Sequence, residues 1–247
     1  MKVRVTDTYE DMSDAALSFV VDQVRHKPDS VLGLAAGSTP LLLYQKMCDA
    51  MKEGTVDFSR IRTFCLDEYI GLSPEAPQSY HSFMKKELFD GLGLPPERTR
   101  IPDGMAADIA RECAMYGAEI EAAGGIDLVI LGIGQNAHIG FNEPGDTFVP
   151  ETHVVELSEA TRQANARFFD SLEETPHWAV SMGIRDIMLS RNILLLASGA
   201  GKTEALYQAV CGDITPKAPA SILQLHRNVL VLADKAAVAR MPTKYLD

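Results

Sequence analysis

The alternation of short apolar runs with longer amphipathic stretches along the whole chain restricts the possible folds more than any other feature. Such runs suit buried strands, and the stretches between them suit helices that pack on a sheet. We therefore predict an α/β fold with one open, mostly parallel sheet flanked by helices. The predicted strands are Val3 to Val5, Val31 to Ala35, Ile61 to Leu66, Leu128 to Ile133, Val154 to Leu157, Ala179 to Met182, Ile193 to Ala197 and Val229 to Leu232.

The length and composition predict one globular domain. At roughly 150 residues per domain, 247 residues allow one large domain or two small ones, and we find no linker or composition break. We therefore predict a single domain over residues 1–247. Hydrophobic residues make up 46% of the chain and charged residues 23%, as in globular proteins, which excludes a mainly disordered chain.

The charge and hydropathy exclude two classes of partner. The 23 Lys and Arg residues against 34 Asp and Glu residues give a net charge of −11, which argues against binding nucleic acid. No apolar run approaches the roughly 20 residues that span a bilayer, and the polar N-terminus does not resemble a signal peptide. We expect a cytoplasmic protein. The sequence does not distinguish a monomer from a homo-oligomer. The four cysteines have neither metal-site nor disulfide-framework spacing, which favours buried free thiols.

Two predicted strands are followed by residues suited to an anion. Ligands bind at the carboxyl ends of parallel strands in open α/β sheets. Gly37, Ser38 and Thr39 follow one strand and precede a helical stretch, which could bind an anion through free N–H groups. An ordinary Ser/Thr helix cap is the alternative interpretation. Another strand is followed by a Gly-rich turn that ends in Lys202, a cation that is not specific by itself.

Acid and base groups follow two other strands. Asp67 and Glu68 stand where a strand ends, so one could accept a proton, although acids at such a place more often form a solvated turn or a structural ion pair. His138 and Glu143 share the long Gly-rich loop from Gly134 to Pro150. Loops longer than about 12 to 15 residues are usually functional, and a His with a nearby carboxylate favours acid/base catalysis.

The sequence offers no cofactor or metal site. A Walker A loop that ended at Lys202 would need a glycine where Leu196 stands. Gly132 to Ala137 fits the dinucleotide fingerprint, but Gly140 and Pro144 prevent the helix that this fingerprint must open. Metal-ligand spacings and the serine-hydrolase motif are absent. We therefore expect no cofactor, and a small phosphorylated substrate whose protons are moved by Asp67 and the His138/Glu143 pair.

Five separated motifs resemble the glucosamine-6-phosphate deaminase family, within the superfamily of glucosamine-6-phosphate isomerases and 6-phosphogluconolactonases. The resemblance implies a single modified Rossmann-like domain that converts glucosamine 6-phosphate and water to fructose 6-phosphate and ammonia. It runs over almost the whole chain. The motifs are Leu32 to Pro40, Leu66 to Leu72, Ser79 to His81, Gly132 to Pro144 and Thr161 to Phe169.

The resemblance also implies roles for individual residues. Asp67 is then the base that moves a proton between C2 and C1, and His138 opens the pyranose ring. Glu143 orients the imidazole, as the acid of a triad does. The implied phosphate-binding residues are Gly37, Ser38, Thr39, Arg167 and Lys202.

The chain departs from the family pattern near the implied ring-opening histidine. Asn136 stands where many members have Asp, so it can form hydrogen bonds but adds no charge to the His138/Glu143 pair. Ala137 replaces the usual glycine, which places a Cβ where a positive φ is expected. Ala36 replaces a common Thr in the first motif.

Three other functions compete with deamination of glucosamine 6-phosphate. A 6-phosphogluconolactonase typically has a different sequence after the histidine, whereas this chain reads Asn142-Glu143-Pro144. A sugar-phosphate-sensing regulator would need a DNA-binding segment, which neither the charge nor the N-terminus suggests. Galactosamine 6-phosphate differs from glucosamine 6-phosphate by one hydroxyl configuration, and the sequence does not distinguish the two.

Overall fold

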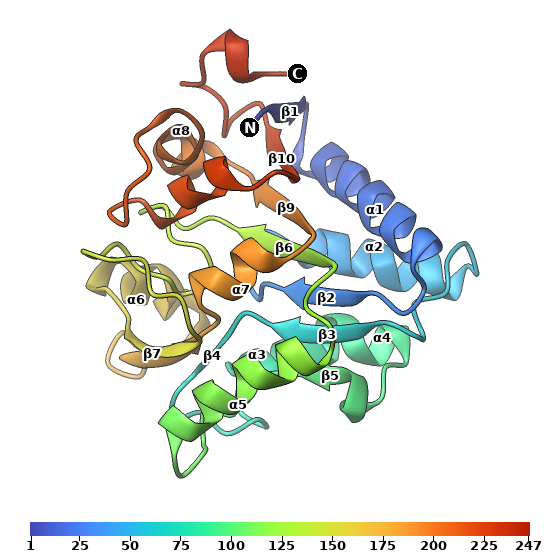
Figure 1. Ribbon diagram of the computed structural model, residues 1–247, viewed down its shortest axis with the longest axis vertical. Coiled ribbons are helices and arrows are strands. Elements are labelled where there is room, and N and C mark those ends of the chain that lie inside the picture. The colour runs from blue at the N-terminus through green and yellow to red at the C-terminus, as the bar shows by residue number, and fades with distance from the viewer.

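The computed structural model describes residues 1–247, and its centre is a seven-stranded parallel sheet (Figure 1). The strand order is β1-β10-β9-β6-β2-β3-β5. This confirms the predicted α/β fold with a mostly parallel sheet. The strands are β1 (Val3–Thr6), β2 (Val31–Leu34), β3 (Arg62–Cys65), β5 (Thr99–Arg100), β6 (Leu128–Gly132), β9 (Asn192–Ala197) and β10 (Val229–Asp234).

A second, antiparallel sheet has the order β4-β8-β7 and holds β4 (Asp67–Tyr69), β7 (His153–Glu156) and β8 (Trp178–Ser181). Two of the eight predicted strands, β7 and β8, are present but pair in this second sheet and not in the large one. Strand β4 follows β3 along the chain after a single residue, Leu66. The backbone N–H of Met182 donates to the Leu66 carbonyl, so the two sheets are joined at this point.

Helices cover the large sheet on both faces (Figure 1). One layer comprises α1 (Tyr9–His26), α2 (Leu41–Lys52) and a continuous helical segment formed by α3 (Tyr80–Met84), the π-helix η1 (Lys85–Phe89) and α4 (Asp90–Leu92). The other layer comprises α5 (Ile109–Ala122), α7 (Ile184–Leu189), α8 (Thr203–Cys211) and the 3-10 helix η5 (Pro219–Leu225). The remaining helical segments are α6 (Glu159–Asn165), η2 (Pro96–Arg98), η3 (Ala166–Phe168), η4 (Ala200–Lys202) and η6 (Thr243–Tyr245).

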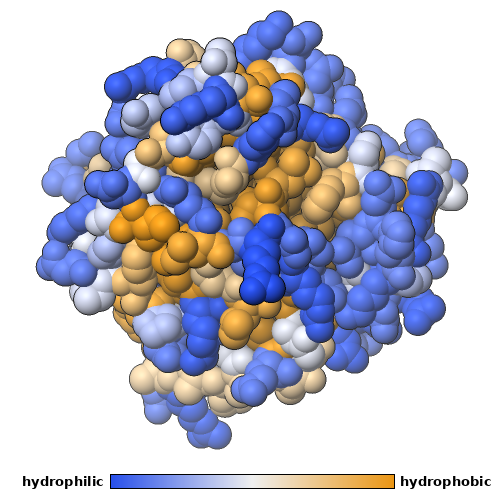
Figure 2. Space-filling view, turned by 45° about the horizontal axis from the view of Figure 1, so that its top comes forward, coloured by the Kyte–Doolittle hydropathy of each residue, from blue (hydrophilic) through white to orange (hydrophobic).

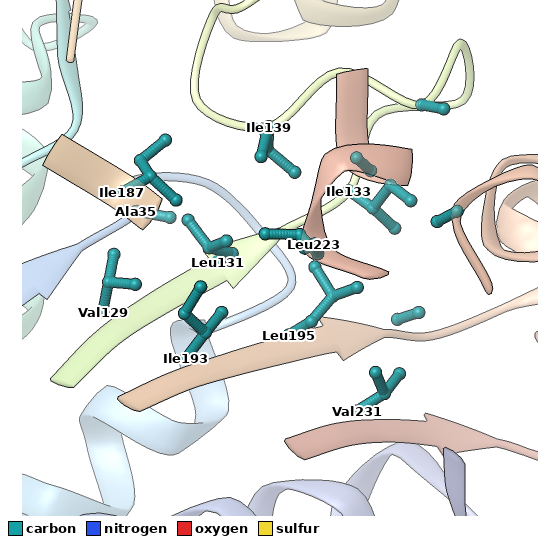
Figure 3. Packing of buried hydrophobic residues seen from close by; sticks show 14 of the residues in the cluster. Ala35, Val129, Leu131, Ile133, Ile139, Ile187, Ile193, Leu195, Leu223 and Val231 are labelled. Atoms are coloured by element: carbon teal, nitrogen blue, oxygen red, sulfur yellow. The ribbon is translucent and has the colours of Figure 1, made fainter. Parts of the chain in front are cut away.

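The central strands divide their side chains between the two layers, because neighbouring residues of a strand point to opposite faces of the sheet. Val129 and Leu131 of β6 pack into the cluster beneath α5, α7 and α8, together with Ile193 and Leu195 of β9 (Figure 3). The intervening leucines and isoleucine pack against α1 and α2. Continuous apolar runs therefore mark strands that are buried on both faces.

The fold buries 86 of its 247 residues. Polar and charged side chains cover most of the face in Figure 2, and exposed apolar ones gather toward its centre. No helix combines the length and the apolar character that crossing a bilayer requires. All four cysteines are free, as expected, although Cys48 and Cys211 are only half-buried.

The long loop after β6 contains no helix or strand between Gly134 and Pro150, as predicted. Buried side chains of its own fix it against the small sheet. The Asn142 amide donates to the carbonyls of Ile139 and Met182, both at 2.9 Å. The Phe141 N–H donates to the Ser181 hydroxyl of β8 at 3.1 Å. A Gly-rich segment thereby keeps one conformation without regular structure.

Candidate active site

The carboxyl ends of β2, β3, β6 and β9 surround a cavity on the side of the molecule where α6 lies (Figure 1). An inner chamber of about 140 Å³ adjoins an outer chamber of about 580 Å³, and the two share several lining residues. Asp67 and Tyr80 line only the inner chamber, whereas Asn136 lines only the outer one. The residues that line both include Ser38, Thr39, His138, Asn165, Arg167 and Lys202.

The turn after β2 presents backbone N–H groups to the cavity. Gly37 has a φ of 123°, a backbone conformation that favours glycine. The N–H groups of Gly37, Ser38 and Thr39 donate to no protein group. The alternative of a Ser/Thr helix cap was wrong, because α2 begins after Pro40 without a side-chain cap. The turn is therefore available to bind an anion.

Two cations complete this end of the cavity. Nη2 of Arg167 donates to Oγ of Ser38 at 3.1 Å. Burial lowers the pKa of the Lys202 ammonium, and the nearby positive charge of Arg167 lowers that pKa further. Two like charges held near each other favour the binding of an anion between them.

Asp67 lines the inner chamber and lies at the junction of the two sheets. It is only 5% exposed. Burial and the nearby Glu68 carboxylate raise the pKa of Asp67 well above its ordinary range, and no hydrogen bond counteracts them. A carboxylate in such a setting is a stronger base than one in water.

Glu68 has a different part in the structure, because neighbouring residues of a strand point in opposite directions. Its carboxylate accepts three backbone N–H bonds, from Tyr69 and Tyr80 through Oε1 and from His81 through Oε2. Two of these donors lie at the start of α3. Glu68 therefore fixes the start of α3 from within the fold and is neither a solvated acid nor half of an ion pair.

Tyr80 and Asn165 line the cavity, but the sequence analysis assigned them no role. The hydroxyls of Tyr69 and Tyr80 lie 3.2 Å apart, and the Asn165 amide donates to the Tyr69 hydroxyl at 3.0 Å. An amide nitrogen only donates, so the Tyr69 hydroxyl accepts from Asn165 and can donate its own hydrogen bond to Tyr80. In that arrangement the Tyr80 hydroxyl proton is not used within the tyrosine pair, and Tyr80 lines the chamber that holds Asp67. Both residues belong to motifs that carry the resemblance, which was the signal available for them.

His138, Glu143 and Asn136 form one group in the loop after β6. Nδ1 of His138 lies 3.7 Å from Oε2 of Glu143. The Asn136 amide donates to that same oxygen at 2.7 Å. Burial raises the pKa of Glu143, but its electrostatic interaction with the His138 side chain and hydrogen bonds outweigh burial and lower the pKa to about 2. Glu143 is therefore a carboxylate behind the imidazole and not in the cavity itself.

The backbone around His138 depends on small residues. Ala137 is fully buried and has a φ of 66°, the only non-glycine residue with a positive φ. This agrees with the expectation that the position requires a left-handed conformation. A Cβ at Gly134 would collide with the His138 ring, so the ring packs directly on the backbone of that glycine. The imidazole is thus held in one orientation.

Eight of the nine predicted site residues therefore line one cavity, and the ninth, Glu143, lies behind His138. An anion-binding turn, two cations, a buried carboxylate and an imidazole line the cavity, and a second carboxylate supports the imidazole. No group of three or more His, Cys, Asp or Glu side chains could hold a metal ion. This arrangement can bind a small phosphorylated molecule and move protons on its carbon and oxygen atoms.

Comparison with known proteins agrees with this geometry. Residues 5–232 match the family model described as glucosamine-6-phosphate isomerases/6-phosphogluconolactonase. The chain is 50% identical to a glucosamine-6-phosphate deaminase of Thermoanaerobacter sp. (strain X514), with 100% of this chain and 97% of the relative covered. It is 51% identical to one of Clostridioides difficile (strain 630), with 99% and 98% covered.

Solved structures give the same result. A monomeric glucosamine-6-phosphate deaminase superposes with a TM-score of 0.94 at 45% identity, with 97% of this chain and 99% of that one covered. A 6-phosphogluconolactonase from Trypanosoma brucei superposes with a TM-score of 0.78 at 22% identity, with 98% of each chain covered. The second likeness concerns the fold alone.

Proposed function

The chain belongs to the glucosamine-6-phosphate isomerase/6-phosphogluconolactonase family, and we propose that it converts glucosamine 6-phosphate and water to fructose 6-phosphate and ammonia. The identity of about 50% to deaminases over the full chain supports this reaction. The proposed enzyme needs no cofactor and serves the breakdown of amino sugars, including those derived from N-acetylglucosamine. We propose that it does so in the cytoplasm, as one domain over residues 1–247.

One observation carries the proposal: a buried carboxylate without hydrogen bonds, Asp67, faces the same small chamber as an anion-binding turn. The phosphate of the substrate binds to Gly37, Ser38 and Thr39 and to the cations of Arg167 and Lys202. Binding energy from this remote phosphate holds the reacting carbons near the carboxylate.

The first chemical step opens the pyranose ring at His138. The imidazole takes the proton of the C1 hydroxyl and returns a proton to the ring oxygen, which leaves an aldehyde at C1. An imidazole that passes through its protonated form needs a neighbouring negative charge. Glu143 supplies that charge, with its nearer oxygen 3.7 Å from Nδ1, and Asn136 holds the carboxylate in place.

The second step moves a proton from C2 to C1. Asp67 removes the C2 proton, and the released electron pair forms a C1–C2 double bond. The carbonyl pair moves to the C1 oxygen, which takes a proton from the ammonium group of the substrate and becomes a hydroxyl. Asp67 then delivers its proton to C1, and the lone pair of the amino nitrogen forms the double bond of a protonated imine at C2. Burial favours both transfers, because a carboxyl group with a raised pKa takes and returns a proton at comparable cost.

The last step adds water to the imine carbon and releases ammonia, which leaves the C2 ketone of fructose 6-phosphate. Tyr80 lines the same chamber as Asp67, and in the second step its hydroxyl can donate to the oxygen at C1 while charge develops there. The overall reaction therefore balances with one water consumed and one ammonia released.

The experiment that tests the proposal measures ammonia from glucosamine 6-phosphate with the purified protein. Parallel incubations contain galactosamine 6-phosphate or 6-phosphogluconolactone, and hydrolysis of the lactone is followed by acid release. Ammonia from glucosamine 6-phosphate, with slower turnover of the others, supports the proposal. Lactone hydrolysis without ammonia release would replace it with the lactonase alternative, and preference for the galactose epimer would change the substrate.

A further inference from the structure

Asp234, the last residue of β10, is a buried carboxylate that takes no part in the reaction described above. It is 7% exposed, and both of its oxygens accept hydrogen bonds. Oδ2 accepts from the Ser198 hydroxyl at 2.6 Å, and the Gly199 N–H donates to both oxygens at 3.0 and 3.1 Å. Oδ1 also accepts from the Ala237 N–H at 2.8 Å. Each of these donors belongs to a turn at the carboxyl end of the large sheet.

The turn that Asp234 holds is the one that delivers Lys202. Ser198 and Gly199 come directly after β9, which pairs with β10 in parallel, so the two carboxyl ends are adjacent. Gly199 has a φ of 88°, and its carbonyl accepts from the Lys202 N–H at 3.0 Å. The Lys202 backbone is therefore connected to Asp234 through two successive hydrogen bonds.

A second feature explains why this turn needs a fixed anchor. Burial and Arg167 lower the pKa of Lys202, so the charged ammonium is costly at this place. A lysine side chain has many rotamers, and a mobile turn would let it move out toward water. Ser198 also lines the outer chamber, but its hydroxyl proton is already donated to Asp234.

We propose that Asp234 is a positioning residue that sets the affinity for phosphate by holding the turn that carries Lys202. The proposal rests on the function assigned to this cavity. It extends that function to a residue that lines neither chamber and lies on a strand from which no site residue comes. Asp234 acts through Lys202, so its effect on phosphate depends on the presence of that ammonium.

The test uses Asp234→Asn with a matched control at the other end of the same sheet. The carboxylate accepts from three donors with two oxygens, whereas an amide has one oxygen and must turn its nitrogen toward a donor. Asp127 is the control, because it is also buried and accepts from Val31 N–H at 2.8 Å, from Lys27 and from Arg191. It lies at the amino ends of the strands, away from the cavity.

Calorimetry with inorganic phosphate measures binding without turnover. We expect Asp234→Asn to raise the Kd for phosphate about ten-fold and the KM for the sugar phosphate similarly, with kcat within about three-fold of wild type. Asp127→Asn is expected to lower Tm while it leaves the phosphate Kd unchanged. In a Lys202→Ala background, Asp234→Asn should weaken binding no further, because coupled residues are not additive.

Three outcomes would overturn the proposal. These are wild-type phosphate affinity in Asp234→Asn, an equal loss of affinity in Asp127→Asn, and a full effect of Asp234→Asn when Lys202 is absent. Should Asp234→Asn fail to fold, Gly199→Ala replaces it, because that Cβ meets no atom within 4 Å but strains the same turn. Wild-type phosphate affinity in Gly199→Ala then overturns the proposal. Failure of ammonia release by the wild type would contradict the proposed function alone, because the binding measurement does not depend on it.

Discussion

The side-chain amide of Asn136 donates a hydrogen bond of 2.7 Å to Oε2 of Glu143. Asn136 therefore acts on the carboxylate that supports the imidazole and not on the imidazole side chain itself. Its own oxygen accepts from the His138 backbone N–H at 3.3 Å, so the amide connects both members of the pair. An acid at position 136, common in the family, would face a second carboxylate at this distance.

Asn136→Asp is expected to raise the pKa of Glu143 above about 2, because the introduced carboxylate lies against the existing one. In the wild type, the lowered pKa of Glu143 stabilises the fold at pH values above the ordinary pKa of a carboxyl group. This stability is lost as the pH falls toward 2. Repulsion in the variant cancels this contribution near pH 7. Acidification from pH 7 to about 4 should then raise Tm relative to a neutral variant, as the pair takes up a proton.

Asn136→Ala is the neutral control, because it removes the same hydrogen bond without adding charge. The measurement is Tm as a function of pH for both variants and the wild type. If the two variants give parallel Tm curves between pH 7 and pH 4, the repulsion between positions 136 and 143 does not exist.

Asp67→Asn is expected to lower turnover by about 10²- to 10⁴-fold, the usual contribution of a general base, while KM changes little. The same substitution should raise Tm at pH 7. Because the pKa of Asp67 is raised, the folded protein holds this proton more tightly than the unfolded chain. Stability therefore falls as the pH rises from about 4 through the raised pKa. Kinetics and calorimetry on one preparation measure both effects. Full activity of the variant would exclude Asp67 as the base, and a lower Tm at pH 7 would contradict the raised pKa.

Lys202→Arg is expected to shift the pH dependence of phosphate binding. The wild type should lose affinity for phosphate as the pH rises toward the lowered pKa of Lys202, because a neutral amine does not attract the anion. A guanidinium stays charged over this range, so the alkaline loss should disappear in the variant. The inhibition constant of phosphate between pH 7 and pH 10 measures this, with Arg167→Lys as a matched control. Identical alkaline profiles for wild type and Lys202→Arg would assign the loss to another group.

Ala137→Gly is expected to change the free energy of unfolding by less than about 1 kcal/mol. Relief of the left-handed conformation, about 1 to 2 kcal/mol, offsets the loss of a buried methyl and the extra freedom of glycine when unfolded. Ala179→Gly in β8 is the control, because Ala179 is also fully buried but lies in an ordinary strand conformation. Urea unfolding of both variants and of the wild type measures the two changes in the free energy of unfolding. A greater loss in Ala137→Gly than in Ala179→Gly would show that the methyl contacts outweigh the strain.

All eight predicted strands are present within one or two residues of their expected bounds, because buried strands leave continuous apolar runs in the sequence. Two short strands were missed. β5 (Thr99–Arg100) has only two residues, and β4 (Asp67–Tyr69) contains two acids, so neither shows an apolar run. The small antiparallel sheet depends on pairing between segments far apart in the chain, which local patterns do not record.

The candidate site followed from the strand ends more directly than from any single residue. Position after a strand was sufficient to bring Asp67, His138 and Lys202 into one region, because the carboxyl ends of parallel strands meet. Arg167 follows no strand of the large sheet, and only the resemblance pointed to it. The orientation of Glu68 toward α3 and the hydroxyl contact of Tyr69 with Tyr80 depend on three-dimensional packing, so the sequence could not separate them from surface groups.

The junction at Leu66 places the proposed base on one sheet and most of the anion-binding groups on the other. Asp67 pairs with Ser181 of the small sheet, whereas the Gly37 turn and Lys202 follow strands of the large sheet. Substitutions that displace the small sheet are therefore expected to lower kcat through Asp67, and substitutions behind the Gly37 turn or Lys202 are expected to raise KM. In such a scaffold, natural selection can change the reaction at the small sheet while the large sheet continues to bind the phosphate of the sugar.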